Sequence, residues 1–141
     1  MKYSVKEAAE KLGMSQHTVR YYTDQGLVPS LQRDQHNNRQ FSQNALDWLT
    51  ACHYLRQTGM SVKAVKHYVD LCLQGHQTIQ ERYQLITAQQ AIAQQQLITA
   101  QKRLAFLNAK EKIYHEEMQG EQNDPMNPNT WQQNDDTKHK C

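Results

Sequence analysis

Four arginines in the first half of the chain have side chains suited to binding phosphate groups or the edges of bases. They are Arg20, which stands beside Tyr21, then Arg33, Arg39 and Arg56. A guanidinium group is a planar fork of N–H donors, and it matches both phosphate oxygens and the N7 and O6 atoms of guanine. An exposed arginine taken alone is more often a solvated surface charge. The elements that carry these side chains therefore decide the interpretation.

Residues 4–27 have the pattern of two short helices joined by a tight turn. Ser4 and Glu7 have the spacing of a capping box at the start of the first helix. Gly13 is placed to end that helix, and Ser15 to cap the second. The buried stripe expected for the first helix consists of Val5, Ala8, Ala9 and Leu12. This pattern predicts a helix-turn-helix.

The second helix of this pair is expected to turn its polar side chains away from the core. Val19 and Tyr22 fall on the inward face. The outward side chains carry an imidazole, a hydroxyl, a guanidinium and a flat phenol ring, and they are His17, Thr18, Arg20 and Tyr21. Such a face suits the major groove of double-stranded DNA. We therefore expect this helix to contact base edges.

The polar segment between Gly26 and Phe41 is predicted to form a β-hairpin wing. Arg33 and Arg39 fall on opposite arms of this hairpin, where both can hold the DNA backbone. Asn38 is expected to cap the turn between them and joins the predicted DNA-binding set. The alternative is an ordinary polar hairpin without a ligand.

Two further helices are predicted to close a small core, with Ser42 and Ser61 as their caps. Arg56 near the end of the third helix and Lys63 at the start of the fourth are placed for a second hold on phosphate. The apolar stripes are Ala45, Trp48, Leu49, Cys52 and Leu55, and then Val62, Val65, Val69 and Cys72. All five glycines fall where a helix is expected to stop, at Gly13, Gly26, Gly59, Gly75 and Gly120.

Composition limits the classes of protein that fit. The chain has 141 residues, 38% of them hydrophobic, and its mean hydropathy of −0.93 is low for a single compact globule, which favours an extended part. Residues 1–75 carry nine Lys or Arg against six Asp or Glu, so basic charge gathers in the first half. We expect no membrane span, a cytoplasmic location, and reduced thiols for the three cysteines.

The order and spacing of these motifs resemble the mercury-resistance (MerR) family of bacterial transcription regulators. The resemblance rests on residues 19–29, on residues 33–41 and on residues 56–62, and it extends over residues 3 to about 118. It implies that DNA contacts are made by Thr18, Arg20, Tyr21, Arg33, Arg39 and Arg56, with His17 in place of a basic residue common in the family.

The resemblance also implies how such a protein works. Family members have a winged helix-turn-helix head followed by a long helix, which dimerises as an antiparallel coiled coil. The dimer bends and untwists a palindromic promoter, so that RNA polymerase responds to a change in DNA shape. Whether a small-molecule inducer acts on this protein, and which one, stays open here, as do the operator and the direction of regulation.

The long helix predicted beyond Gly75 carries its own evidence for dimerisation. Apolar residues alternate at spacings of four and three, which is the pattern of a coiled-coil seam. The seam consists of Ile79, Tyr83, Ile86, Ala93, Leu97, Ala100, Leu104, Leu107, Tyr114 and Met118, interrupted by the polar Gln90 and Glu111. A helix of this length extends roughly 60 Å, too far to bury the seam against a small head. We expect a second copy of the chain as partner.

The cysteines are interpreted as packing residues. Cys52 and Cys72 lie on apolar stripes, and the reactive cysteine position of the aldehyde-responsive branch, which the chain otherwise resembles most, aligns with Tyr54. Cys72 and His76 have a spacing seen in metal sites, but Gly75 interrupts the helix between them. We therefore expect no metal and no cofactor, while leaving open that one of the two cysteines senses electrophiles.

The sequence thus predicts an all-α fold with a small β wing. Its parts are a winged helix-turn-helix domain at 1–75, a coiled-coil dimerisation helix at 76–119 and a disordered tail at 120–141, without a drug-binding domain. Trp131 is either a lone anchor or part of that mobile tail, and Cys141 is expected to be exposed. No catalytic constellation stands out, which argues against an enzyme. The competing hypothesis is a coiled-coil protein-interaction adaptor whose head does not bind DNA.

Overall fold

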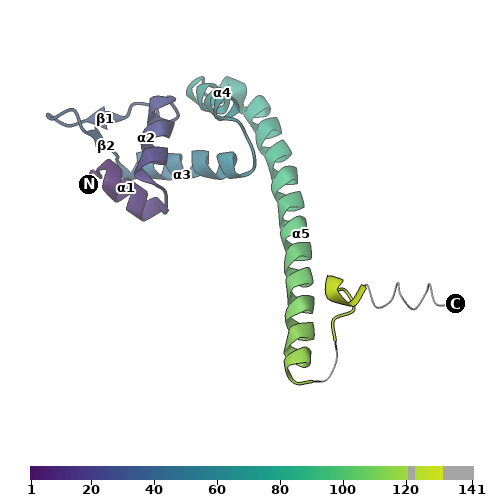
Figure 1. The fold of residues 1–141 in the computed structure, drawn as a ribbon. Helices are drawn as coiled ribbons and strands as arrows, with labels where there is room; N and C mark the ends of the chain where they lie inside the picture. The colour runs from purple at the N-terminus through teal and green to yellow at the C-terminus, as the bar shows by residue number, and fades with distance from the viewer. Residues whose placement is uncertain (121–122, 132–141) are drawn as a thin grey trace. The chain divides into compact units, whose positions relative to one another are not determined.

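The computed structural model describes residues 1–120 and 123–131 and is mostly helical with a two-stranded wing, as predicted (Figure 1). Its elements are α1 (Val5–Leu12), α2 (Gln16–Asp24), β1 (Gln32–Arg33), β2 (Arg39–Gln40), α3 (Gln43–Gln57), α4 (Val62–Leu73), η1 (His76–Thr78), α5 (Ile79–Met118) and η2 (Pro128–Thr130). The chain divides into two compact units, Met1–Gln94 and Gln95–Cys141, which we call the head unit and the tail unit.

The four helices α1 to α4 begin at the predicted serines. Ser4 accepts the backbone N–H of Glu7 at 3.1 Å, and the Glu7 side chain accepts the backbone N–H of Ser4, so the capping box is complete. The remaining three caps have the same geometry and are Ser15, Ser42 and Ser61. Gly13 ends α1 at a φ of 65°, a conformation that only glycine adopts readily. The positions of these helix ends are therefore set by local sequence.

The core of the head unit lies between α1, α2, α3 and α4. Its largest fully buried apolar side chains are Val19, Leu27, Phe41, Leu46, Leu49, Val65 and Val69. The expected stripe on α4 is wrong at one place, because Cys72 is half-buried while the neighbouring Leu71 is buried. On α3, Leu46 rather than Ala45 is fully buried. The spacing of apolar residues predicts which face of a helix is buried. It does not predict which side chains at the edge of that face are covered.

The wing pairs Arg33 directly with Arg39 in an antiparallel register. Its turn is held by Asp34, whose Oδ1 accepts the backbone N–H of His36 at 2.8 Å and of Asn38 at 2.9 Å. The expectation that the Asn38 side chain caps the turn is therefore wrong. The Asp34 carboxylate accepts the backbone N–H of Asn38 instead. A backbone bridge from Tyr3 to Phe41 fastens the start of the chain to the base of the wing.

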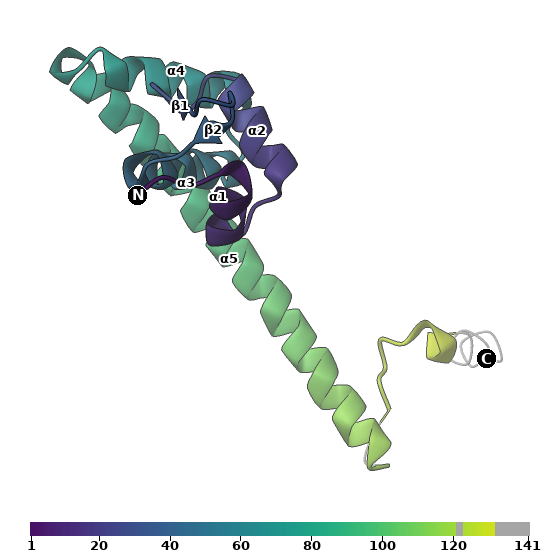
Figure 2. The same ribbon diagram turned by 90° about the vertical axis from the view of Figure 1, so that its left-hand side faces the viewer.

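Helix α5 is a single unbroken helix in both views (Figure 1 and Figure 2). It has 40 residues, and none of them is buried. Its large apolar side chains include Leu97 and Leu104, which are 59% and 57% exposed. A soluble protein rarely leaves so much apolar surface in contact with water unless a partner covers it.

Residues 123–131 carry local structure that their polar composition does not predict. Asp124 is only 1% exposed, and its carboxylate binds the Lys110 ammonium at 2.6 Å and accepts the backbone N–H of Met126 at 2.9 Å. The Glu117 carboxylate accepts the backbone N–H of Asp124. Trp131 is 51% exposed, and the expectation for Cys141 lies outside the described residues.

These contacts predict a pH dependence within the tail unit. The hydrogen bond from Lys110, followed by that from the Met126 amide, lowers the pKa of Asp124 below its ordinary value of 3.8. A carboxyl group with a lowered pKa contributes stability that is complete above its unfolded pKa and is lost as the pH falls through the folded value. We expect protection of the Met126 amide from hydrogen exchange to fall at pH below about 4. Asp124→Asn should remove that protection at neutral pH, whereas Asn129→Asp should leave it unchanged.

Candidate nucleic-acid interface

The recognition helix predicted from the sequence is α2, and most of its predicted contacts are free to meet a ligand. His17, Arg20 and Tyr21 are exposed, while Val19 and Tyr22 are buried. Arg20 makes a long hydrogen bond of 3.4 Å to Gln16, so its guanidinium is weakly held. The helix therefore presents a guanidinium, an imidazole and a phenol to solvent on a rigid support.

Thr18 differs from the other predicted contacts on α2. It is half-buried, and its hydroxyl lies 2.8 Å from the hydroxyl of Ser15, the residue that caps the helix. The backbone N–H of Thr18 donates to the same Ser15 oxygen at 3.0 Å. Thr18 thus takes part in fixing the start of α2, and any contact it makes with a ligand comes from a hydroxyl that is already hydrogen-bonded.

A polar cleft of about 410 Å³ lies between the start of α1, the start of α2 and the wing, and we call it the basic cleft. It brings together four residues of the predicted set, namely Arg20, Arg33, Asn38 and Arg39. It is also lined by Lys2 and Lys6, which the sequence analysis did not select. Five cationic side chains against the carboxylates of Glu7 and Asp34 give this cleft a net positive charge, which would attract a polyanion.

Arg39 is held more tightly than a free phosphate-binding arginine. Its guanidinium binds the carboxylate of Asp24 at 2.5 Å, and its side chain is only 17% exposed. Its Nε atom is buried without a hydrogen-bond partner. Because Asp24 ends α2 and Arg39 lies in β2, this ion pair fastens the wing to the recognition helix. Arg39 therefore positions the wing and keeps limited surface for a ligand.

Arg33 lies opposite Arg39 on the wing and is exposed. It donates one hydrogen bond to the backbone carbonyl of Asn37 at 3.0 Å. Two cations directly opposite each other destabilise a hairpin unless an anion is near. Asp24 supplies one negative charge to Arg39, and a phosphate bound at Arg33 would supply another.

The second predicted hold on phosphate lies at the turn between α3 and α4. Arg56 is half-buried and donates to the backbone carbonyl of Met60 at 2.5 Å, which closes this turn. Lys63 is exposed in the first turn of α4. Neither residue lines the basic cleft. The structure therefore gives Arg56 a structural role, and a DNA contact at this place remains a prediction.

The surroundings of Cys52 favour packing over reactivity. Its side chain is 1% exposed and its sulfur lies 3.8 Å from the carbonyl oxygen of Leu27. Burial, and then the neighbouring Cys72, raise the pKa of Cys52 to about 11, so the thiol stays protonated at neutral pH. A protonated, buried thiol is a poor nucleophile.

We expect the double variant Cys52→Ala, Cys72→Ala to lose about 1 kcal/mol of unfolding free energy per site. Operator binding and inducible transcription should persist, because neither sulfur is required for the fold of α2 or the wing. Urea denaturation measures the stability, and a reporter challenged with aldehydes measures the response. If induction disappears while operator binding is intact, one of these cysteines is the sensor and the packing interpretation is wrong.

Two further observations concern the described residues, 1–120 and 123–131. No three or more His, Cys, Asp or Glu side chains come together there in a group that could hold a metal ion. None of the helices described is both long and apolar enough to span a membrane.

Comparison with known proteins now identifies the family. Residues 3–72 match the family described as MerR HTH family regulatory protein. An uncharacterized HTH-type transcriptional regulator of Haemophilus influenzae is 36% identical over 114 residues, which are 81% of this chain and 84% of the relative. The chain belongs to the MerR family.

Solved structures of MerR family regulators have the same fold. HiNmlR, a MerR family regulator lacking the sensor domain, was crystallised bound to promoter DNA; it matches with a TM-score of 0.77 and 35% identity over 85% of this chain and 92% of that chain. A MerR family regulator from Bacillus thuringiensis matches with a TM-score of 0.70 and 31% identity over 79% and 98% of the two chains. The protein is a DNA-binding transcriptional regulator of this family. The predicted helical fold with a small wing and a long helix, and the predicted role in DNA-binding transcription regulation, are confirmed.

Proposed function

We propose that the protein binds palindromic promoter DNA as a homodimer and controls transcription by distorting the duplex. The observation that carries this proposal is the basic cleft, which places cations from α1, α2 and the wing around one polar hollow. A single phosphate backbone passing through the cleft would neutralise several of them. The structure solved for the similar HiNmlR with promoter DNA supports this use of the head.

We assign base contacts and phosphate contacts to different side chains, according to how exposed each one is and which element carries it. Arg20 and Tyr21 extend from α2 and read base edges in the major groove, with His17 beside them. Arg33, Lys2 and Lys6 hold the phosphates that border this groove. Phosphate contacts fix the register of the head, and contacts to bases give sequence preference.

The proposed homodimer is supported by the exposed apolar face of α5. The seam residues Leu97, Leu104 and Leu107 are each more than half exposed in the single chain. A second copy in antiparallel orientation would cover them and would place two identical heads around a two-fold axis. An operator read by such a dimer is palindromic, because each half-site meets the same α2.

Further parts of the proposal come from the family. We infer that the dimer acts on RNA polymerase through DNA shape, that it works in the cytoplasm where bacterial DNA is located, and that it is not an enzyme. A small-molecule inducer would shift the balance between two shapes of the bound promoter. The adaptor hypothesis predicts instead that the head binds protein and leaves duplex DNA free.

Salt dependence separates the two hypotheses. Footprinting on the DNA upstream of the protein's own gene would first locate an operator, and its affinity would then be measured at several salt concentrations. We expect affinity to fall steeply with salt, because each neutralised phosphate releases counterions. Two variants that remove the same charge serve as a matched pair, Lys6→Ala in the cleft and Lys112→Ala on α5. Only Lys6→Ala should make the decrease of affinity with salt less steep. Absence of duplex binding at low salt would favour the adaptor.

A further inference from the structure

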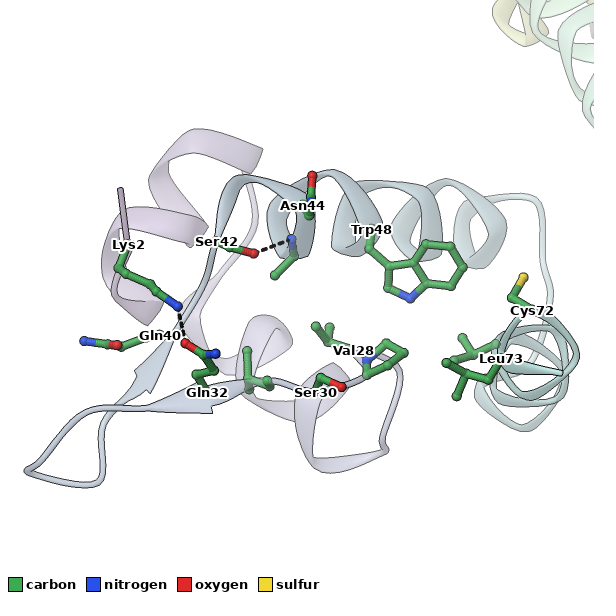
Figure 3. Close-up of a pocket in the computed structure, with 14 residues that line it drawn as sticks. Lys2, Val28, Ser30, Gln32, Gln40, Ser42, Asn44, Trp48, Cys72 and Leu73 are labelled. Atoms are coloured by element: carbon green, nitrogen blue, oxygen red, sulfur yellow. Dashed lines mark hydrogen bonds between the residues drawn. The ribbon is translucent and has the colours of Figure 1, made fainter. Parts of the chain in front are cut away.

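A cavity of about 440 Å³ opens in the head unit (Figure 3). Its walls are residues 28–32 at the base of the wing, the start of α3 and the end of α4, and we call it the head cavity. Sites for small molecules have volumes of roughly 300–1,000 Å³, which includes this value. Among its described lining residues, only Lys2 and Gln40 also line the basic cleft, and none belongs to the DNA-binding set predicted from the sequence. The rest of its lining, residues 28–32 with parts of α3 and α4, is distinct from that of the basic cleft.

The lining of the head cavity changes from polar to apolar along its length. Lys2, Gln32 and Gln40 gather at one end, and Trp48 and Leu73 lie at the other (Figure 3). Lys2 is the charged residue among those that line the cavity, and its ammonium donates to the Gln32 side chain. A ligand that matches both ends has an apolar body and one anionic group.

The apolar end is preformed. Nε1 of Trp48 donates to the carbonyl of Leu27 at 2.7 Å, and the indole is stacked against the Tyr68 ring with 6.3 Å between centroids and 6° between planes. The indole is thus fixed before any ligand arrives, which lowers the entropic cost of binding. In the opposite wall Ser30 has a φ of 55°, a strained conformation for a residue other than glycine, and such strain clusters at ligand sites.

We propose that the head cavity binds a small aromatic carboxylate, with the ring at Trp48 and Leu73 and the carboxylate at Lys2. Charge complementarity selects an anion, because none of the described residues that line the cavity is acidic and could neutralise Lys2. The ligand would connect the base of the wing to the end of α4. By holding these two walls together it would change how freely the wing moves, and so the affinity of the head for DNA.

A titration of the full chain tests this proposal without DNA, so its outcome does not depend on the proposed function. The probe is 3-phenylpropionate, with 3-phenylpropanol and propionate as matched compounds that lack the charge or the ring. The signal is the indole N–H resonance of Trp48 in a Trp131→Phe background, where it belongs to the single remaining tryptophan. We expect a saturable shift with 3-phenylpropionate and a weaker response to the other two compounds.

Two variants locate the site. Lys2→Ala should weaken 3-phenylpropionate roughly three- to fivefold and leave 3-phenylpropanol unchanged, since Lys2 is exposed and its ion pair is screened. Lys63 is an exposed lysine outside the cavity, so Lys63→Ala should change the affinity for neither compound. Leu73 is 64% exposed, so Leu73→Glu can add a negative charge at the apolar end without burying it, and it should abolish the shift.

Three outcomes would overturn the proposal. The first is an indole resonance that does not move with any probe up to about 10 mM, where even weak binding is detected. The second is a Leu73→Glu variant that binds 3-phenylpropionate like the parent, which would put the compound elsewhere. The third is equal binding of the acid and the alcohol in both the parent and Lys2→Ala, which would mean that the carboxylate is not recognised.

Discussion

Replacing Leu97 with Asp is expected to convert the proposed dimer into monomers and to remove tight binding to a palindromic duplex. Leu97 lies near the middle of the seam and is 59% exposed in the single chain, so the substitution is tolerated by the monomer. In a dimer the same position is covered, and each chain brings one carboxylate into the interface. Leaving a buried charge without a partner costs roughly 3–5 kcal/mol, and the dimer has two.

Sedimentation equilibrium measures the change in assembly, and titration of a palindromic operator measures its effect on binding. Gln95→Asp is the matched control, because Gln95 is exposed on α5 outside the seam and receives the same new charge. The control should remain a dimer with parental affinity. If Leu97→Asp also remains a dimer with full operator affinity, the seam is not the interface and dimerisation uses another surface.

Replacing Arg20 with Ala is expected to weaken operator binding by about 1–3 kcal/mol, which is the range for a side chain that reads a base. Arg20 is exposed and makes one long contact, to Gln16, so its loss should leave the unfolding free energy within about 0.5 kcal/mol. The discrimination between the operator and a mutated half-site should fall as well. Binding curves on both duplexes measure the two effects.

Arg39→Ala tests the distinction between reading and positioning. Because Arg39 is tied to Asp24, its removal should weaken binding and also loosen the wing, and Asp24→Asn should reproduce part of that loss without removing a cation. For Arg20→Ala there is no corresponding variant of a carboxylate partner, because Arg20 forms no ion pair of this kind. Lys112→Ala on the tail unit controls for net charge. Unchanged affinity in both Arg20→Ala and Arg39→Ala would remove α2 and the wing from the DNA interface.

The features predicted from the sequence are those that depend on near neighbours. A cap at Ser42 or Ser61 needs an amide three positions on, and a helix ending at Gly13 needs a residue that adopts a positive φ. Arg33 and Arg39 fall on opposite arms of the wing because only a short turn separates them. In each case the interacting groups are close in sequence, so residue type and spacing were sufficient.

Apart from the wing turn, where Asp34 and not Asn38 supplies the side-chain acceptor, the features that the sequence did not predict depend on contacts between distant residues. Lys2 reaches the basic cleft because the Tyr3–Phe41 bridge folds the start of the chain onto the wing, a pairing across nearly forty positions. The Asp24–Arg39 ion pair spans 15 positions and changes Arg39 from a free cation into a support. The periodicity of the sequence does not predict such long-range contacts, because the two residues come together only in the folded tertiary structure.

The Tyr3–Phe41 bridge has a practical consequence for handling the protein. Met1 is 96% exposed, yet the next residue, Lys2, lines both the basic cleft and the head cavity. An affinity tag fused ahead of Met1 would lie next to both the basic cleft and the head cavity. There a run of histidines or a charged linker can interfere with the binding of phosphate or of a small anion. Affinities measured on an amino-terminally tagged preparation would then describe the tag as much as the protein, so cleaving the tag before measurement becomes part of the assay.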